Sequence, residues 1–304
     1  MAWILGHQQP DGGFGALETM SASMVAPASL LYCGRPEEAG RVIQWQRSTY
    51  VREDGWFDPP EIRAGRASSL AERPYAPSWM IYSAHCNLAF DISIRAVPHL
   101  LRMQDPRSGG MFGRAEEAEA GRGIINAAVT AVACQAEARR MADHLTDHVI
   151  AENRDWETAF YPIWDTERGL RTDEEAQPTG NMPRLILRSG LNQHLHLPGA
   201  MVAVLADLHQ VTREQKYLDG ARQVFDFVAG APPEVLATTL AHKFAWGSAW
   251  LFRATGDARC VEAACRVWSQ EWTWMRGLFF WGWSVPDPVY DEWERKHFTA
   301  RHKL

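Results

Sequence analysis

A short turn motif recurs three times within the first 113 residues of the chain. It reads QQPDGGFG at positions 8–15, REDGWFD at 52–58 and QDPRSGGMFG at 104–113. Glycine adopts backbone angles that other residues resist, and aspartate side chains accept hydrogen bonds from nearby backbone N–H groups. Each copy therefore predicts a tight turn, and the recurrence predicts a repeated supersecondary unit.

The segments between and after these turns show helical periodicity and are of two alternating kinds. Helices that are apolar or small on all sides are expected over residues 18–34, 76–90, 121–141, 194–212 and 235–257. Amphipathic helices are expected over residues 36–50, 91–104, 142–156, 213–230 and 258–274. A helix that is apolar all round is buried, whereas a one-sided helix lies on the outside. The alternation predicts an all-α fold, an α/α toroid of about five to six hairpins in which outer helices wrap a barrel of inner helices.

The turn motifs are expected to join each outer helix to the next inner helix. Asp11 and Asp105 should bond backbone N–H groups inside the turns. The glycines expected to permit the reversal are Gly12, Gly13, Gly109 and Gly110. The aromatic residues expected to fill the space between neighbouring hairpins are Phe14, Trp56, Phe57 and Phe112. We therefore interpret the motifs as structural, and we expect residues 1–304 to form a single domain.

The composition narrows the class of protein. With 304 residues and a formal net charge of −6, the chain has no basic stripe of the kind that nucleic-acid-binding proteins carry. Its apolar runs are shorter than the ~20 residues of a membrane-spanning helix, and the N-terminal MAWILGHQQ lacks the features of a secretory signal. Five cysteines without CxxC or metal-ligand spacing predict reduced thiols in a cytoplasmic protein. Fourteen tryptophans suit a large core or an aromatic-walled cavity.

The stretches QQPDGGFG and QDPRSGGMFG resemble the Gln-Asp-Gly-Gly-Phe/Trp repeats of the terpenoid-cyclase and protein-prenyltransferase superfamily, which includes the squalene–hopene cyclases. The resemblance implies an α/α toroid in which each repeat ends an outer helix. A small-residue inner helix, whose first turns face a central cavity, would then follow. Residues 201–228 and 243–257 are similar to the paired-helix repeats of other helical toroids.

The chain departs from this superfamily in its acidic and metal-binding motifs. It has no Asp-x-Asp-Asp acid motif, and its nearest acidic stretch, RTDEEAQ at 171–177, lies in a polar segment expected to be a solvated loop. The Asp, Cys and His spacing of the prenyltransferase zinc site is also missing from the sequence. We therefore expect neither protonation-initiated cation chemistry nor protein prenylation, and we expect no metal and no other cofactor.

Polar residues near the N-terminal ends of the inner helices are the candidates for chemistry. Phenol, guanidinium and imidazole groups polarise carbonyls or move protons, although most such residues in cores serve only as hydrogen-bonded packing. The expected catalytic residues are Tyr82, Arg122, His194 and His242. The residues expected to bind substrate are Ser23, Trp79, Cys86, Asn126, Trp164, Asn192, His196, Lys243 and Trp246. Trp164 lies in an irregular stretch, residues 155–184, which is either a lid or a linker between the two halves of the ring.

The favoured hypothesis is a natural-product cyclase or isomerase that folds a hydrophobic polyene in an aromatic central cavity. Proximity and orientation lower the barrier to a concerted ring closure, such as a Diels–Alder-type cyclisation, without a strong acid. The alternative is a carbohydrate-active barrel enzyme, that is, an epimerase, lyase or hydrolase. Glycoside hydrolysis requires a pair of carboxylates, and the inner-helix ends offer only Glu18 and Glu119, from different hairpins. A third reading is a scaffold or ligand-binding ring without catalysis.

Overall fold

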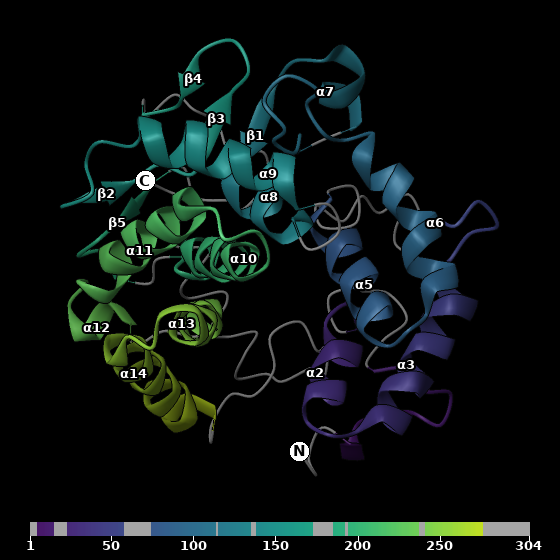
Figure 1. Ribbon diagram of the computed structural model, residues 1–304. Helices are drawn as coiled ribbons and strands as arrows, with labels where there is room; N and C mark the ends of the chain where they lie inside the picture. Colours follow the sequence, from purple (N-terminus) through teal and green to yellow (C-terminus); the bar gives the residue numbers. More distant parts are fainter. Residues whose placement is uncertain are drawn as a thin grey trace, which may run out of the picture.

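Helices dominate the computed structural model and form two concentric layers (Figure 1). The structure describes residues 5–14, 23–57, 74–113, 115–134, 138–172, 185–191, 194–236 and 241–275. The inner helices are α2 (Ala26–Tyr32), α5 (Tyr75–Cys86), α8 (Ala127–Ala133), α10 (His196–Thr212) and α13 (His242–Thr255). Each inner helix contacts the next one along this series.

The outer layer follows the same order along the chain. Its helices are α3 (Pro36–Thr49), α6 (Phe90–Leu101), α9 (Arg139–His144) continued by the π-helix η2 (Leu145–Ile150), α11 (Gln215–Ala229) and α14 (Ala258–Met275). Each packs against the inner helix that precedes it in the sequence. The described residues therefore form five helical hairpins, and the predicted α/α toroid is confirmed.

Burial explains why the two layers separate. Every residue of α10 from His196 to Ala206 is buried, because this helix has neighbours on all sides. The outer helix α11 buries one face only, which carries Tyr217, Ala221, Val224 and Val228. Alternation of these two burial patterns is what sorts the helices into an inner and an outer ring.

The connections at the two ends of the barrel differ in length. Links from an inner to an outer helix are short, for example residues 213–214 and 256–257. Links from an outer to the next inner helix are long and contain the remaining elements. These are α7 (Ala115–Ala120), α12 (Pro233–Leu236), β1 (Ile124–Asn126), β2 (Ala159–Phe160), β3 (Ile163–Asp165), β4 (Gly169–Leu170) and β5 (Ile186–Leu187). The long connections thus lie at the end of the barrel where the inner helices begin. Catalytic and binding residues are often carried by such loops, so we expect them at this end.

Two small antiparallel sheets belong to these long connections. One has the strand order β1-β3-β4, with Ile125 opposite Trp164, and the other pairs β2 with β5. The sequence analysis predicted a single helix over 121–141, but its first residues form β1. Gly121 and Gly123 have positive φ values of 63° and 146°. Non-helical backbone at these glycines, followed by two β-branched isoleucines, favours a strand before the helix starts.

The three turn motifs adopt one shared structure. Isolated antiparallel bridges close the turns at Gln8–Phe14, Val51–Phe57 and Gln104–Met111. Their positive-φ glycines are Gly12 at 97°, Gly55 at 92° and Gly109 at 83°. The aspartates accept backbone hydrogen bonds: Asp11 from Gly13 at 2.9 Å, Asp54 from Trp56 at 3.0 Å and Asp105 from Ser108 at 3.0 Å. The predicted role of the aspartates is therefore confirmed.

Each turn is locked onto the outer helix that follows it. A Cβ atom at Gly12 would lie 2.4 Å from the carbonyl oxygen of Arg41, and one at Gly109 would lie 2.3 Å from that of Arg140. The arginines reach back to the turns, Arg41 to the Gln8 side chain at 2.9 Å and Arg140 to a main-chain carbonyl at 2.6 Å. The motifs therefore hold neighbouring hairpins together, as predicted.

Gly13 and Gly110 are glycines for a reason other than the one predicted, because their φ values are not positive. The place where a Cβ would stand is already filled by an aromatic ring of the outer helix. A Cβ would lie 2.6 Å from the ring of Trp45 at Gly13 and 2.8 Å from the ring of His144 at Gly110.

Replacing Asp105 by alanine is expected to lower the free energy of unfolding by about 2 kcal/mol, because partly buried N–H and O–H donors lose a charged acceptor. The Asp105 side chain is 1% exposed and also accepts the Ser108 hydroxyl at 2.7 Å. Burial alone would raise the pKa of Asp105, but these hydrogen bonds hold it below its usual value. Urea unfolding measures the change. The matched control is Asp54→Ala. The Asp54 carboxylate is 40% exposed, so its removal should lower the free energy of unfolding by less than the removal of the Asp105 carboxylate; equal losses would contradict this account.

Candidate active site

Three imidazole rings meet at the end of the barrel where α10 and α13 begin. His196 and His242 are the first residues of these two helices, and their rings stack with centroids 5.9 Å apart and planes 10° apart. The His194 ring lies 5.3 Å from that of His196. His196 is buried, whereas His194 and His242 are partly exposed. We call these three residues the imidazole cluster.

A close helix crossing holds the cluster together. A Cβ at Gly199 would lie 2.3 Å from the backbone nitrogen of Phe244, and one at Gly247 would lie 2.4 Å from the carbonyl oxygen of Gly199. Only glycine permits this approach, which sets the first turns of α10 and α13 side by side. Pro198 lies in the first turn of α10, where its missing N–H costs no helical hydrogen bond. The sequence analysis expected this helix over residues 194–212, and the structure starts it two residues later, at His196.

Lys243 extends the site toward the middle of the barrel. It is buried and donates a hydrogen bond to the Tyr75 hydroxyl, and its ammonium lies 4.5 Å from the Tyr75 ring centroid and 5.1 Å from that of Trp79. The Trp79 ring is 5.7 Å from that of Trp246. Because α5 and α13 are not neighbours along the ring, these contacts cross the barrel axis. Three residues that were predicted to bind substrate therefore lie together: Trp79 of α5, and Lys243 and Trp246 of α13.

Tyr82 and Cys86 lie at the opposite end. The Tyr82 hydroxyl is 2.5 Å from that of Tyr32, which is 3.8 Å from the Cys86 sulfur. Burial, followed by the hydrogen bond to Tyr32, raises the pKa of Tyr82. The helix α5 begins at Tyr75, so Tyr82 stands about 10 Å further along its axis. The structure therefore does not bring Tyr82 and Cys86 to the imidazole cluster.

Three further predicted residues lie on other elements. Arg122 is exposed between α7 and β1. Asn126 is buried in β1, and its side-chain oxygen accepts the Val129 N–H at 3.3 Å at the start of α8. Ser23 is buried, and its carbonyl oxygen accepts a hydrogen bond from Gln46 at 2.7 Å. Asn192 lies outside the described residues.

Trp164 packs in the outer layer, beside a pair of histidines that the sequence analysis missed. Its ring lies 5.3 Å from that of His144 and 5.0 Å from that of His148, and its N–H donates to Glu152 at 3.0 Å. His144 is fully buried, and neither of its ring nitrogens has a hydrogen-bond partner among the described residues. Burial, reinforced by the nearby His148, lowers the pKa of His144 to about 3.

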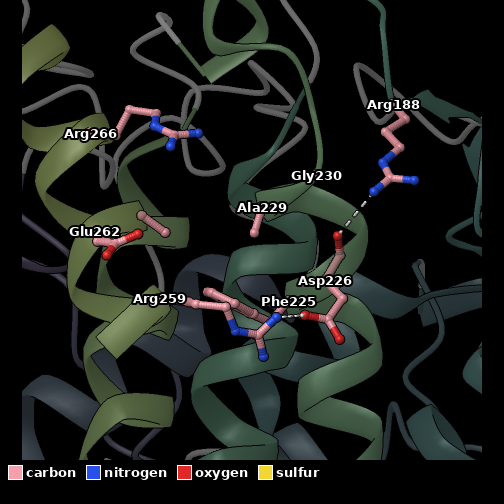
Figure 2. Close-up of a pocket in the computed structure, with 9 residues that line it drawn as sticks. Arg188, Phe225, Asp226, Ala229, Gly230, Arg259, Glu262 and Arg266 are labelled. Atoms are coloured by element: carbon pink, nitrogen blue, oxygen red, sulfur yellow. Dashed lines mark hydrogen bonds and ion pairs between the residues drawn. The ribbon is translucent and has the colours of Figure 1, made fainter. Parts of the chain in front are cut away.

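A separate cavity of about 410 Å³ lies in the outer layer between α11 and α14 (Figure 2). Figure 2 shows Arg259 turned to the Asp226 carboxylate, 3.0 Å away, and Arg188 turned to the Asp226 carbonyl, 3.5 Å away. Arg188 also pairs with Glu157 at 3.1 Å. These two arginines therefore cross-link surface elements.

In the described part of the chain, no group of three or more His, Cys, Asp or Glu side chains is placed to hold a metal ion. None of the described helices combines the length and the apolar character needed to cross a membrane.

Comparison with solved structures identifies a protein of the same fold. The crystal structure of D-mannose isomerase superposes with a TM-score of 0.60 at 14% sequence identity, covering 90% of this chain and 84% of that chain. No protein-family model and no curated protein sequence matches the chain. At this identity the likeness concerns the fold alone. It confirms the toroid, while the narrower resemblance to terpenoid cyclases stays a prediction.

Proposed function

We propose that this chain is an isomerase that moves a proton between adjacent carbons of a small hydroxy-carbonyl compound, such as an open-chain sugar. The observation that carries the proposal is the stacked pair His196 and His242 at the loop-rich end of the barrel. Two imidazoles side by side provide an acid and a base near neutral pH. The fold shared with D-mannose isomerase supports the same class of reaction.

The proposed reaction needs two coupled proton transfers. One imidazole of the pair removes the proton from C2 of an aldose, and the electrons of that bond form the C1–C2 double bond of an enediol while O1 takes up a proton. The proton then returns to C1, O2 loses its proton, and the carbonyl re-forms at C2. The second imidazole moves the hydroxyl proton between the two oxygens.

The helix ends assist the same step. Among the described residues, the N-cap positions of α10 and α13 are Leu195 and Ala241, which make no side-chain capping hydrogen bond. The partial positive charge at a helix N-terminus stabilises negative charge that develops on a substrate oxygen. Lys243, the next residue after His242, is held by Tyr75 and Trp79 and adds a fixed cation at this level of the barrel.

The test is conversion of a panel of aldoses and ketoses in deuterated water, followed by NMR. The wild-type protein should isomerise at least one sugar and incorporate solvent deuterium at the carbon that is reprotonated. His242→Gln should lower kcat about a hundredfold or more, because it removes one acid–base group. His85→Gln, an exposed histidine on α5, should retain wild-type kcat. The proposal fails if no sugar reacts or if His242→Gln keeps full activity.

The polyene cyclase expected from the sequence is a second candidate, favoured by a different observation. A pocket of about 240 Å³ at the far end of the barrel is lined mainly by apolar side chains and by the rings of Tyr82, Trp246 and Trp250. Aromatic walls of this kind can hold an unsaturated hydrophobic substrate in one conformation. Ring closure of a polyene that survives His242→Gln and is lost in Trp250→Ala would favour this candidate over the isomerase.

A further inference from the structure

The pocket at the far end of the barrel has one charged group among its eleven lining residues. It opens between α5, α10 and α13, and no residue of the imidazole cluster lines it. Val204 and Leu208 of α10 contribute to its apolar wall, whereas Asp207, between them in the sequence, brings a carboxylate. The proposed isomerase reaction does not use this pocket.

Asp207 makes no ion pair within the described part of the chain, and its exposed side chain lies at the open side of the pocket, beside apolar residues and aromatic rings. Partial loss of water on the side that faces the pocket raises the pKa of Asp207, and the charge of Arg253 only partly opposes this rise. A carboxylate that loses part of its water without gaining an ion-pair partner is destabilised, so a cation entering the pocket would relieve that part of the cost.

The rings beside Asp207 attract cations as well. Tyr82, Trp246 and Trp250 line the same pocket, and the faces of such rings carry partial negative charge. The guanidinium of Arg253 already lies 5.0 Å from the Trp250 ring centroid, so this ring holds one cation in the structure. A carboxylate combined with aromatic rings is the chemistry that recognises an alkylammonium group.

We propose that the pocket formed by Asp207, Tyr82, Trp246 and Trp250 binds a small organic cation with an alkylammonium group. Asp207 supplies the opposite charge, and the rings supply cation–π contact and apolar area. The volume of about 240 Å³ suits a compact head group of this kind. A neutral hydrocarbon of the same shape would fill the space but leave the carboxylate without a partner.

The test compares choline with 3,3-dimethyl-1-butanol, which has the same shape without the charge, by isothermal titration at pH 7.5. Choline should bind the wild-type protein at least tenfold more tightly than the alcohol. Asp207→Asn should abolish this preference, and Trp250→Leu should weaken choline binding. Glu234→Gln, which removes an exposed carboxylate on α12, should leave the binding of both compounds unchanged.

Three results would overturn the proposal: no binding of choline, equal binding of the two compounds, or an Asp207→Asn variant that keeps the preference. Equal binding would instead favour a purely apolar chamber, as the cyclase hypothesis requires. Because no turnover is measured, this outcome is independent of whether the chain isomerises sugars.

Discussion

Replacement of Gly199 by alanine is expected to destabilise the protein by about 3 kcal/mol or more, because the added methyl group would overlap the backbone of the neighbouring helix. A Cβ at this position would lie 2.3 Å from the backbone nitrogen of Phe244 and 2.4 Å from the carbonyl carbon of Lys243. Backbone atoms cannot rotate away as a flexible side chain can, so α10 and α13 must separate. Urea unfolding and the thermal midpoint measure the loss.

Gly40→Ala is the matched control for this substitution. Gly40 lies inside α3, and a Cβ there would meet nothing within 4 Å. Alanine is the better helix former by about 1 kcal/mol, so Gly40→Ala should leave stability unchanged or raise it. A Gly199→Ala protein as stable as the wild type would contradict the close crossing of α10 and α13. It would also remove the structural reason for the stacking of His196 on His242.

The ring architecture could be predicted from the sequence because it depends on patterns that repeat. Five apolar helices alternate with five amphipathic ones, and that alternation alone sorts inner from outer positions. The turn motifs could be interpreted for the same reason, since Asp11 and Asp105 act within a few residues of their partners. Local chemistry of this kind is visible in the sequence without knowledge of the fold.

Contacts between distant segments could not be predicted in this way. The overlap of Gly199 with Phe244 depends on how closely two helices cross, and nothing near Gly199 in the sequence indicates it. Tyr82 was expected near the histidines, but it lies seven residues after the start of α5 at Tyr75, toward the other end of that helix. Asp207 is a single acidic residue in an apolar helix, and only the pocket around it gives it significance.

The position of His144 could be predicted from the sequence only in part. Each outer helix that follows a turn motif carries an arginine and, four residues later, a ring: Arg41 and Trp45, Arg95 and His99, Arg140 and His144. A comparison of the three repeats could have aligned His144 with Trp45. The pairing of that ring with the second glycine of the turn, Gly110, requires the structure.

The buried His144 is expected to make stability depend strongly on pH. Its pKa is about 3 in the folded protein, against 6.5 for the free side chain, because burial and the nearby His148 disfavour the charged form. Between these two values the unfolded chain binds the extra proton, so stability falls as the pH drops below 6.5. The loss from this group should be about 2 kcal/mol at pH 5 and about 4–5 kcal/mol near pH 3, and none at pH 7.5.

His144→Phe tests this expectation, because it keeps a ring beside Gly110 and Trp164 but removes the titrating group. Urea unfolding at pH 7.5 and pH 5 should show that the variant loses about 2 kcal/mol less than the wild type over this interval. His99→Phe is the matched control, since His99 occupies the equivalent place on α6 but is partly exposed and stacks on Trp56. It should keep the wild-type pH dependence. If His144→Phe loses as much stability as the wild type between pH 7.5 and pH 5, other groups cause the acid sensitivity. The folded protein would then accommodate a protonated and hydrated His144.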